Sequence, residues 1–306
     1  MPKIRLGIDL GGTKTEAVAL RADGSEAARH RVATVRGSYP DTLKTISDLV
    51  GTIEDLADTR FDQVGLGIPG SVSPSTGLVR NANSTWINGK PLLADLSRVL
   101  ERDVRISNDA NCFALSECRD GAAIGATSVF AAILGTGVGG GLVLNGQIVE
   151  GAHGLGGEWG HVPLARTSDN GQTPVCFCGQ LGCMEQYLSG PAIARDYLAR
   201  GGAETDSVAV ISERSQSGET LATECLARHL DRLARGLSTI INVFDPAIVV
   251  LGGGVSNLAG LVENLPAAIA PYVFAPTSDK IEIKIARALW GDSSGVRGAA
   301  RLWEQV

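Results

Sequence analysis

The apolar positions of the chain follow two periods, which together predict alternating strands and helices. Alternating or continuous apolar runs predict strands over 3–9, 15–20, 64–68, 104–107, 129–134, 142–144 and 248–251. Apolar residues three or four positions apart predict helices over 40–57 and 224–244, and helices are also predicted over 91–100, 255–270 and 292–303. A further helix opens at Asn108-Asp109 and runs to about residue 117. This order of elements predicts an α/β fold.

Glycine-rich turns follow three of the predicted strands. Residues 9–15 (DLGGTKT) and 135–141 (GTGVGGG) are glycine-threonine turns, one in each half, which suggests a duplicated architecture. Glycine lets backbone N–H groups converge on phosphate oxygens, although the spacing of a Walker A loop is absent. Ordinary hairpins, or relief of crowding in a sheet, are the alternatives. We predict a nucleotide site at the three turns, formed by Asp9, Gly11, Gly12, Thr13, Lys14, Gly135, Thr136, Gly137, Gly139, Gly252, Gly253 and Gly254.

Length and charge narrow the choice of partners. A chain of 306 residues exceeds the usual size of one hydrophobic core and predicts two domains. The formal net charge is −6 and Lys and Arg form no cluster, which disfavours nucleic acid and anionic membranes and favours a small molecule. The chain shows neither the apolar core of a signal peptide nor an apolar stretch of about 20 residues that would span a bilayer. We therefore expect a cytoplasmic protein.

Cysteine spacing predicts a metal site. Three of the six cysteines lie within residues 176–183 (CFCGQLGC). With His161, the thiols of Cys176, Cys178 and Cys183 complete the tetrahedral ligand set of a structural Zn²⁺ site. The alternative is a group of buried thiols beside an unrelated histidine. A closed four-ligand site has no position for water, so we expect zinc to shape a pocket and not to activate a nucleophile.

Two aspartates end predicted strands. Asp109 follows the strand 104–107 and opens a helix, at the edge where open α/β sheets bind ligands. Its alternative role is that of an ordinary helix N-cap. Asp9 ends the first strand, where it would hold Mg²⁺ through water or cap the turn.

Four motifs in this order resemble the bacterial ROK family (repressor, open reading frame, kinase). They are DLGGTK at 9–14, the turn from 134 to 141, GEWGH at 157–161 and CxCGxxGCxE at 176–185. The resemblance covers essentially the whole chain. It implies an actin-like (sugar kinase, ribonuclease H-like) fold with two α/β lobes around a cleft that holds ATP and sugar. We expect residues 1–118 to form one lobe, with 292–306 packing on it, and 119–291 the other, with a zinc-binding segment at 161–183.

The resemblance also implies roles for individual residues. Asp109 matches the family's catalytic base, and a carboxylate with an ordinary pKa near ~3.9 would mainly orient the sugar hydroxyl and take its proton late. His161 would contact both zinc and sugar. Asn81 and Trp86 lie in a segment that resembles one near the sugar pocket of fructokinase-like members, although an aromatic more often packs. The predicted sugar contacts are Asn83, Asn108, Asp109, Glu158, His161 and Glu185.

The segments 81–89, 157–161 and 291–295 favour a fructokinase or manno(fructo)kinase that uses MgATP to phosphorylate a hexose. Residues 108–117 and 135–141 look equally like N-acetylglucosamine kinases of the family, and glucokinase stays open. A sugar-responsive repressor is disfavoured, because the first glycine turn begins at residue 11 and leaves no room ahead of it for a DNA-binding domain. A polymerising or chaperone-like ATPase of the same superfold would not need the zinc ligands. A homodimer is compatible with the family.

Overall fold

The computed structural model describes residues 4–164, 173–205, 207–275, 279 and 281–304, and the chain divides into two compact units. Unit 1 contains Met1–Gly125, Gly141–Gly157 and Asp292–Val306, and unit 2 contains Ala126–Gly140 and Glu158–Gly291. Part of the predicted zinc segment, residues 165–172, lies outside the described residues. The expected division at 118/119 differs from this one mainly because residues 141–157 belong to unit 1.

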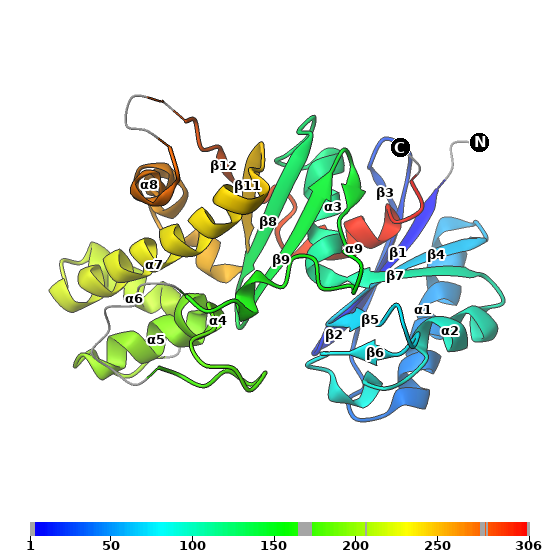
Figure 1. The fold of residues 1–306 in the computed structure, drawn as a ribbon. Coiled ribbons are helices and arrows are strands. Elements are labelled where there is room, and N and C mark those ends of the chain that lie inside the picture. The colour runs from blue at the N-terminus through cyan, green and yellow to red at the C-terminus, as the bar shows by residue number, and fades with distance from the viewer. Residues whose placement is uncertain (1–3, 165–172, 206, 276–278, 280, 305–306) are drawn as a thin grey trace. The chain divides into compact units, whose positions relative to one another are not determined.

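Unit 1 is built on a five-stranded mixed sheet of order β3-β2-β1-β4-β7 (Figure 1). The strands β1, β4 and β7 are parallel, and the β1–β2 and β2–β3 pairs are antiparallel. The edge strand β3 was not predicted, because its sequence EAARHRVA lacks a clear apolar alternation. The bounds are β1 Arg5–Leu10, β2 Lys14–Leu20, β3 Glu26–Ala33, β4 Gln63–Ile68 and β7 Asp103–Asn108, with the short pair β5 Ser71–Val72 and β6 Val79–Arg80.

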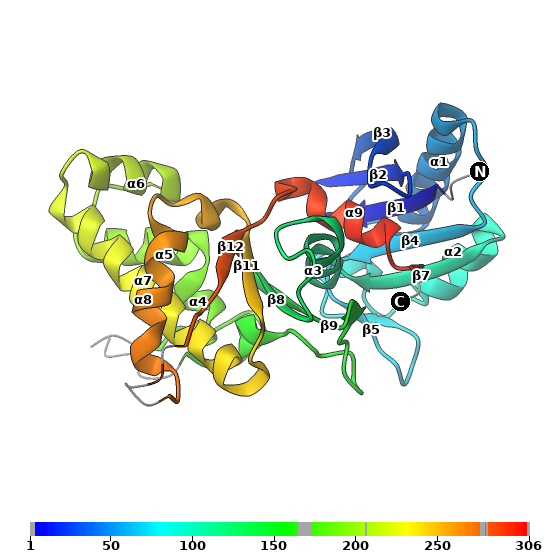
Figure 2. The same cartoon turned by 90° about the horizontal axis from the view of Figure 1, so that it is seen from above.

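Four helices accompany this sheet, and the alternation of side chains along the strands decides which face each covers. Leu6 and Ile8 of β1 share a buried cluster with the apolar stripes of α1 (Tyr39–Ala57) and α2 (Leu92–Leu100). The intervening Gly7 faces α9 (Ser294–Ala300), which packs beside α3 (Asp109–Asp120), as Figure 2 shows. The predicted helix over 91–100 is confirmed, except that Pro91 is the residue before its first turn.

Close backbone approach explains several glycines of unit 1. A Cβ on Gly7 would lie 2.3 Å from the backbone N of Ala300, and one on Gly65 would lie 1.8 Å from the carbonyl oxygen of Ala299. Gly298 of α9 lies just as close to α3, because its Cβ would lie 1.7 Å from the carbonyl of Cys112. The C-terminal helix therefore packs directly on the sheet and on the helix that begins at Asp109.

The second sheet has the order β10-β9-β8-β11-β12, and β9 crosses the boundary between the units at residues 140/141. The glycines at 139–141 lie inside β9 and not in the turn, which corrects the predicted turn over 135–141. The predicted helix over 255–270 is confirmed only for Leu261–Ile269, because Gly260 has φ +72° and separates a 3-10 turn from α8. The bounds are β8 Ser128–Leu134, β9 Val138–Leu144, β10 Gln147–Ile148, β11 Ile248–Gly252 and β12 Ile285–Arg287.

Unit 2 contains the helices α4 to α8. The longest, α7, spans Thr220–Phe244, begins four residues before the predicted start, and buries an apolar stripe against its neighbours. The other bounds are α4 Glu185–Leu188, α5 Gly190–Ala199, α6 Val208–Gln216 and α8 Leu261–Ile269. Among the described residues, the helices are too short or too polar to cross a membrane.

Candidate functional site

The first glycine turn joins β1 to β2 in unit 1. The backbone N–H of Gly11 donates to the carbonyl of Lys14 at 3.0 Å, and a Cβ on Gly11 would lie 2.7 Å from that oxygen. Gly12 has open space beside it, since a Cβ there would be 4.0 Å from its nearest neighbour, the hydroxyl of Ser84. Thr13 is exposed, and the ammonium of Lys14 lies 3.6 Å from a carboxylate oxygen of Asp292. Gly12 is therefore the glycine of this turn that contacts within the protein do not require.

Asp9 lies beside this turn and has an unusual environment. Burial raises its pKa to about 7, and the negative charges of Asp109 and Glu16 act in the same direction. Lys14 partly opposes them. A Cβ on Gly295 would lie 3.4 Å from the carboxylate of Asp9, an ordinary van der Waals distance, so the start of α9 lies directly beside this carboxylate. A buried carboxylate that feels a second one is an arrangement that favours a bound cation.

Asp109 is the first residue of α3, and its neighbour Asn108 is the N-cap. The side-chain oxygen of Asn108 accepts from the backbone N–H groups of Ala110 and Asn111, at 2.9 and 3.4 Å. Its amide nitrogen donates to the carbonyl of Gly70 at 2.9 Å. The cap considered for Asp109 is thus supplied by Asn108. One oxygen of Asp109 accepts from Ala110 N–H at 2.8 Å.

In the segment 81–86, which contains another predicted sugar contact, the aromatic residue packs on the core and the two asparagines are exposed. Trp86 donates from its indole nitrogen to the hydroxyl of Thr42 at 3.0 Å and packs on the core. Its aromatic ring therefore serves packing. Asn83 is exposed, and Asn81 adopts a left-handed backbone with φ +59°.

The other two glycine turns come together in unit 2. Gly253 has φ +80°, and a Cβ there would lie 2.4 Å from the carbonyl of Leu134, at the end of β8. The carbonyl of Gly135 accepts from the backbone N–H of Gly190 at 2.8 Å. The turns after β8 and β11 are therefore neighbours, with Gly252 in the last position of β11 and Thr136 exposed.

The glycines of these turns fall into two groups. A Cβ on Gly11, Gly137 or Gly253 would clash with the protein at 2.4 to 2.7 Å, so the fold explains them. A Cβ on Gly135 or Gly254 would meet nothing within 4 Å. Relief of crowding within the protein therefore does not account for this second group.

The predicted zinc ligands gather at one point of unit 2. Their ligand atoms all lie within 4.8 Å of one another. The sulfurs of Cys178 and Cys183 are 3.7 Å apart, and the sulfur of Cys176 is 3.6 Å from Nδ1 of His161. A tetrahedral ion with Zn–S near 2.3 Å and Zn–N near 2.0–2.1 Å separates such atoms by about 3.8 and 3.5 Å. The donor set and its spacing fit zinc.

Glu185 connects this cluster to the second glycine turn. One of its oxygens accepts from the backbone N–H of Val138 at 3.1 Å, and the other lies 3.9 Å from the sulfur of Cys176. Trp159 donates to the carbonyl of Gly139 at 2.8 Å. Glu158 precedes the short 3-10 turn Trp159–His161. The glutamates and His161 are therefore held by the same small group of segments.

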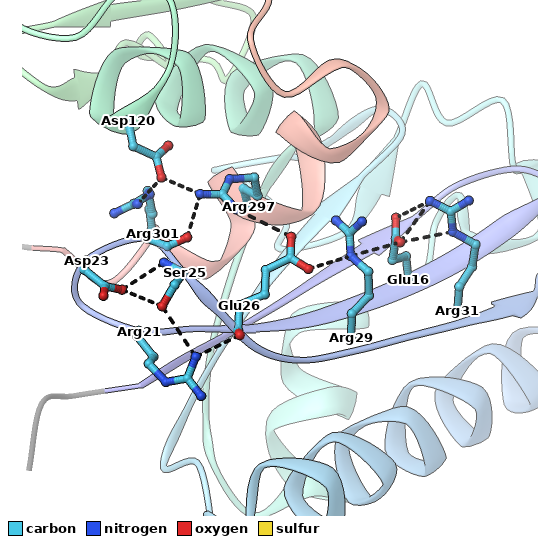
Figure 3. Close-up of polar contacts among 11 residues, drawn as sticks. Glu16, Arg21, Asp23, Ser25, Glu26, Arg29, Arg31, Asp120, Arg297 and Arg301 are labelled. Atoms are coloured by element: carbon cyan, nitrogen blue, oxygen red, sulfur yellow. Dashed lines mark hydrogen bonds and ion pairs between the residues drawn. The ribbon is translucent and has the colours of Figure 1, made fainter.

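Sequence reasoning missed a row of charges that crosses the sheet beside Asp9. Glu16 lies opposite Asp9 on β2, is only 1% exposed, and forms a bidentate pair with Arg31 at 3.0 Å (Figure 3). Arg29 approaches the same carboxylate at 3.5 Å. A glutamate inside the otherwise apolar strand TEAVAL was the available signal.

Comparisons with known proteins agree with this geometry. The model of the ROK family matches residues 5–306. N-acetyl-D-glucosamine kinases from Pectobacterium atrosepticum and Haemophilus influenzae are each 40% identical, covering 97% of this chain and 97% and 98% of theirs.

Solved structures show the same fold. A ROK hexokinase from Thermus thermophilus is 30% identical with a TM-score of 0.84, covering 97% of both chains. A ROK family glucokinase from Streptomyces griseus, in complex with glucose and AMPPNP, is 26% identical with a TM-score of 0.79 over 98% of this chain and 99% of that one. The fold is thus the actin-like one expected, and the chain belongs to the ROK family.

Proposed function

We propose that this chain is an ATP-dependent kinase that transfers the γ-phosphoryl group to a hydroxyl of N-acetylglucosamine. The observation that carries the proposal is the 40% identity to N-acetyl-D-glucosamine kinases over 97% of both chains. The relatives that match best among those compared do not support fructose, so the fructokinase expectation gives way to the alternative stated beside it. Glucose is a second candidate, because a glucokinase with the same fold was solved with glucose.

The roles follow from the chemistry of each residue. Asp109 would accept the hydrogen of the sugar hydroxyl, orient it, and take the proton as the bond to phosphorus forms. Its support is its place at the carboxyl end of β7, close enough to Asp9 for its charge to raise the pKa of that group. The backbone N–H groups near Gly12, Gly135 and Gly254 would bind phosphate oxygens of the nucleotide.

Asp9 fits a cation. A buried carboxylate whose pKa lies near 7 without a metal is stabilised as the anion when a divalent ion binds beside it. Asp9 would hold the Mg²⁺ that accompanies ATP, and the ion would neutralise charge on the transferred phosphoryl group. The protein's own part is to keep this carboxylate fixed against Gly295 and Gly67.

The His161 and cysteine cluster would hold Zn²⁺ as a closed structural site, which has no position for a substrate water. Nδ1 of His161 lies 3.6 Å from the sulfur of Cys176, so with zinc on Nδ1 the proton is on Nε2, which can donate to a sugar hydroxyl. Glu185 and Glu158 would add carboxylate acceptors for other hydroxyls. The cluster would then fix the position of the sugar-binding groups.

The test is a panel of N-acetylglucosamine, glucose, fructose and mannose in a coupled ADP-release assay with MgATP. We expect the highest kcat/KM for N-acetylglucosamine. A higher kcat/KM for glucose would replace the substrate while keeping the reaction. Absence of sugar-dependent ADP release with every hexose would refute the kinase proposal.

A further inference from the structure

A basic pocket lies in unit 1 at the end of the sheet opposite Asp9 and Asp109. Arg5 begins β1, and Arg105 is the third residue of the parallel strand β7, whereas Asp9 and Asp109 stand at the carboxyl ends of the same strands. Asp9 lies four residues after Arg5 along β1, a rise of about 13 Å. The pocket is therefore distinct from the site that the proposed function uses.

The pocket has a volume of about 660 Å³ and is lined by four arginines and one glutamate among the residues described. A second hollow of about 380 Å³ shares three of these arginines and the same glutamate. The chain as a whole carries a net charge of −6, so this concentration of guanidinium groups runs against its overall balance. The lining arginines are Arg5, Arg105, Arg119 and Arg301.

Carboxylates compensate only part of this charge. Glu304 forms ion pairs with three of the arginines, Arg5 at 3.3 Å, Arg119 at 3.5 Å and Arg301 at 2.6 Å. Arg301 also pairs with Asp120, which Arg297 shares at 2.6 Å (Figure 3). Among the residues that the structure describes, the four guanidinium groups at the pocket thus form ion pairs with two carboxylates, and a fifth arginine shares one of these.

Arg105 is the group best placed to meet a ligand. It is exposed, its guanidinium lies 4.0 Å from the centre of the Trp303 ring, and it donates to the carbonyl of Leu302 at 2.8 Å. These are neutral partners, which leave its positive charge without a carboxylate in these contacts. An arginine held flat against an indole keeps its remaining N–H donors in a fixed plane, which suits two oxygens of one anion.

We propose that this pocket binds a small phosphorylated anion, either free phosphate or a phosphomonoester, through Arg105 and Arg5. A dianion would supply the negative charge that Glu304 and Asp120 do not, and charge-assisted hydrogen bonds to guanidinium are the usual means of holding it. The proposal does not depend on the sugar substrate or on the transfer reaction.

The probes are inorganic phosphate and N-acetylglucosamine 6-phosphate, titrated into the full chain at constant ionic strength and followed by tryptophan fluorescence and calorimetry. Binding near Arg105 changes the surroundings of Trp303, so Trp303→Phe should lose most of the fluorescence response. Equal weakening of both probes by Arg105→Gln shows that phosphate alone suffices. A larger effect of Arg105→Gln on the sugar phosphate assigns the site to a phosphomonoester.

We expect saturable binding to the wild type and to the control Arg98→Gln, an exposed arginine on α2 whose side chain pairs with Asp95. Arg105→Gln and Arg5→Gln should each weaken binding about tenfold or more, because each loses a charged donor. Both variants should unfold at nearly the wild-type temperature. Absence of saturable binding to the wild type, or equal affinity in wild type, Arg105→Gln and Arg5→Gln, would overturn the proposal.

Discussion

The two units present different chemistry at their candidate sites. Unit 1 offers two partly buried carboxylates, Asp9 and Asp109, at the ends of parallel strands, and the pKa of Asp9 is raised because removal from water opposes its charge. Unit 2 offers three thiols and an imidazole that match a closed metal site, with Glu185 connecting them to a glycine turn. On the proposed roles, unit 1 therefore supplies the carboxylates for proton and cation binding, and unit 2 supplies the structural site that would shape the sugar pocket. Changes in unit 1 should therefore alter turnover, and changes in unit 2 should alter sugar binding and stability together.

The largest expected effect is that of Asp109→Asn. An amide cannot take the hydroxyl proton, so kcat should fall by roughly 10²–10⁴-fold while sugar and ATP still bind. Steady-state kinetics and calorimetric binding separate the two quantities. Asp103→Asn is the matched control, since this exposed aspartate begins the same strand. Turnover close to normal in Asp109→Asn would remove the assigned base.

Asp9→Asn should raise the free energy of unfolding at high pH. The pKa of Asp9 is raised from 3.8 to about 7 in the folded protein. The contribution of this carboxyl to the free energy of unfolding is therefore complete below pH 3.8 and is lost as the pH rises to about 7. Without magnesium or nucleotide, the variant should be more stable than wild type at pH 8, by up to roughly 4 kcal/mol. Urea unfolding at pH 5 and pH 8 measures this.

The same variant should lose magnesium-dependent turnover, because it lacks the carboxylate that would hold the ion. An unfolding difference that is equal at pH 5 and pH 8 would contradict the buried, raised-pKa account of Asp9. Asp103→Asn again serves as control and should leave the pH dependence unchanged.

Cys178→Ala should damage unit 2 without touching the chemistry of unit 1. Loss of one of four ligands should reduce bound zinc below one ion per chain and raise the KM for sugar at least about tenfold. Elemental analysis, kinetics and thermal unfolding measure the three quantities. Cys118→Ala, at the far end of α3 in unit 1, should keep its zinc. A metal-free Cys178→Ala with full activity would refute the structural zinc site.

Gly135→Ala gives the smallest and sharpest effect. Its Cβ would meet nothing in the protein, so thermal stability should hold, yet the KM for ATP should rise about tenfold if phosphate oxygens lie against this backbone. Gly137→Ala is the comparison, because its Cβ would lie 2.7 Å from Glu185 and should lower stability as well. An unchanged KM for ATP in Gly135→Ala would argue against a nucleotide at this turn.

The sequence predicted most elements of the fold because their apolar periods are strong. An uninterrupted apolar pattern marks the helices α1 and α7 and the buried strands β1, β4, β8 and β11. The edge strand β3 was missed because half-exposed charged residues replace the apolar alternation. The break at Gly260 was missed because a single positive φ is set by local geometry that periodicity does not carry.

The sequence predicted the part of the candidate site that depends on the spacing of residues along the chain. The cluster of His161 and three cysteines follows from ligand type and separation along the chain, and the structure brings these residues together. The cap role of Asn108 and the pair of the buried Glu16 with the exposed Arg31 depend on which side chain points inward, which neighbouring strands decide. The choice between fructose and N-acetylglucosamine also lay beyond the motifs, because different segments pointed to different substrates. Residues 81–89, 157–161 and 291–295 favoured a fructokinase, whereas 108–117 and 135–141 looked equally like N-acetylglucosamine kinases.

Phosphorus NMR of the reaction mixture is the most direct test of phosphoryl transfer to N-acetylglucosamine. A phosphomonoester resonance should grow in proportion to ADP when MgATP and N-acetylglucosamine are both present. The same resonance should be absent with Asp109→Asn over the same time. ADP formed with inorganic phosphate and no phosphomonoester would contradict this transfer.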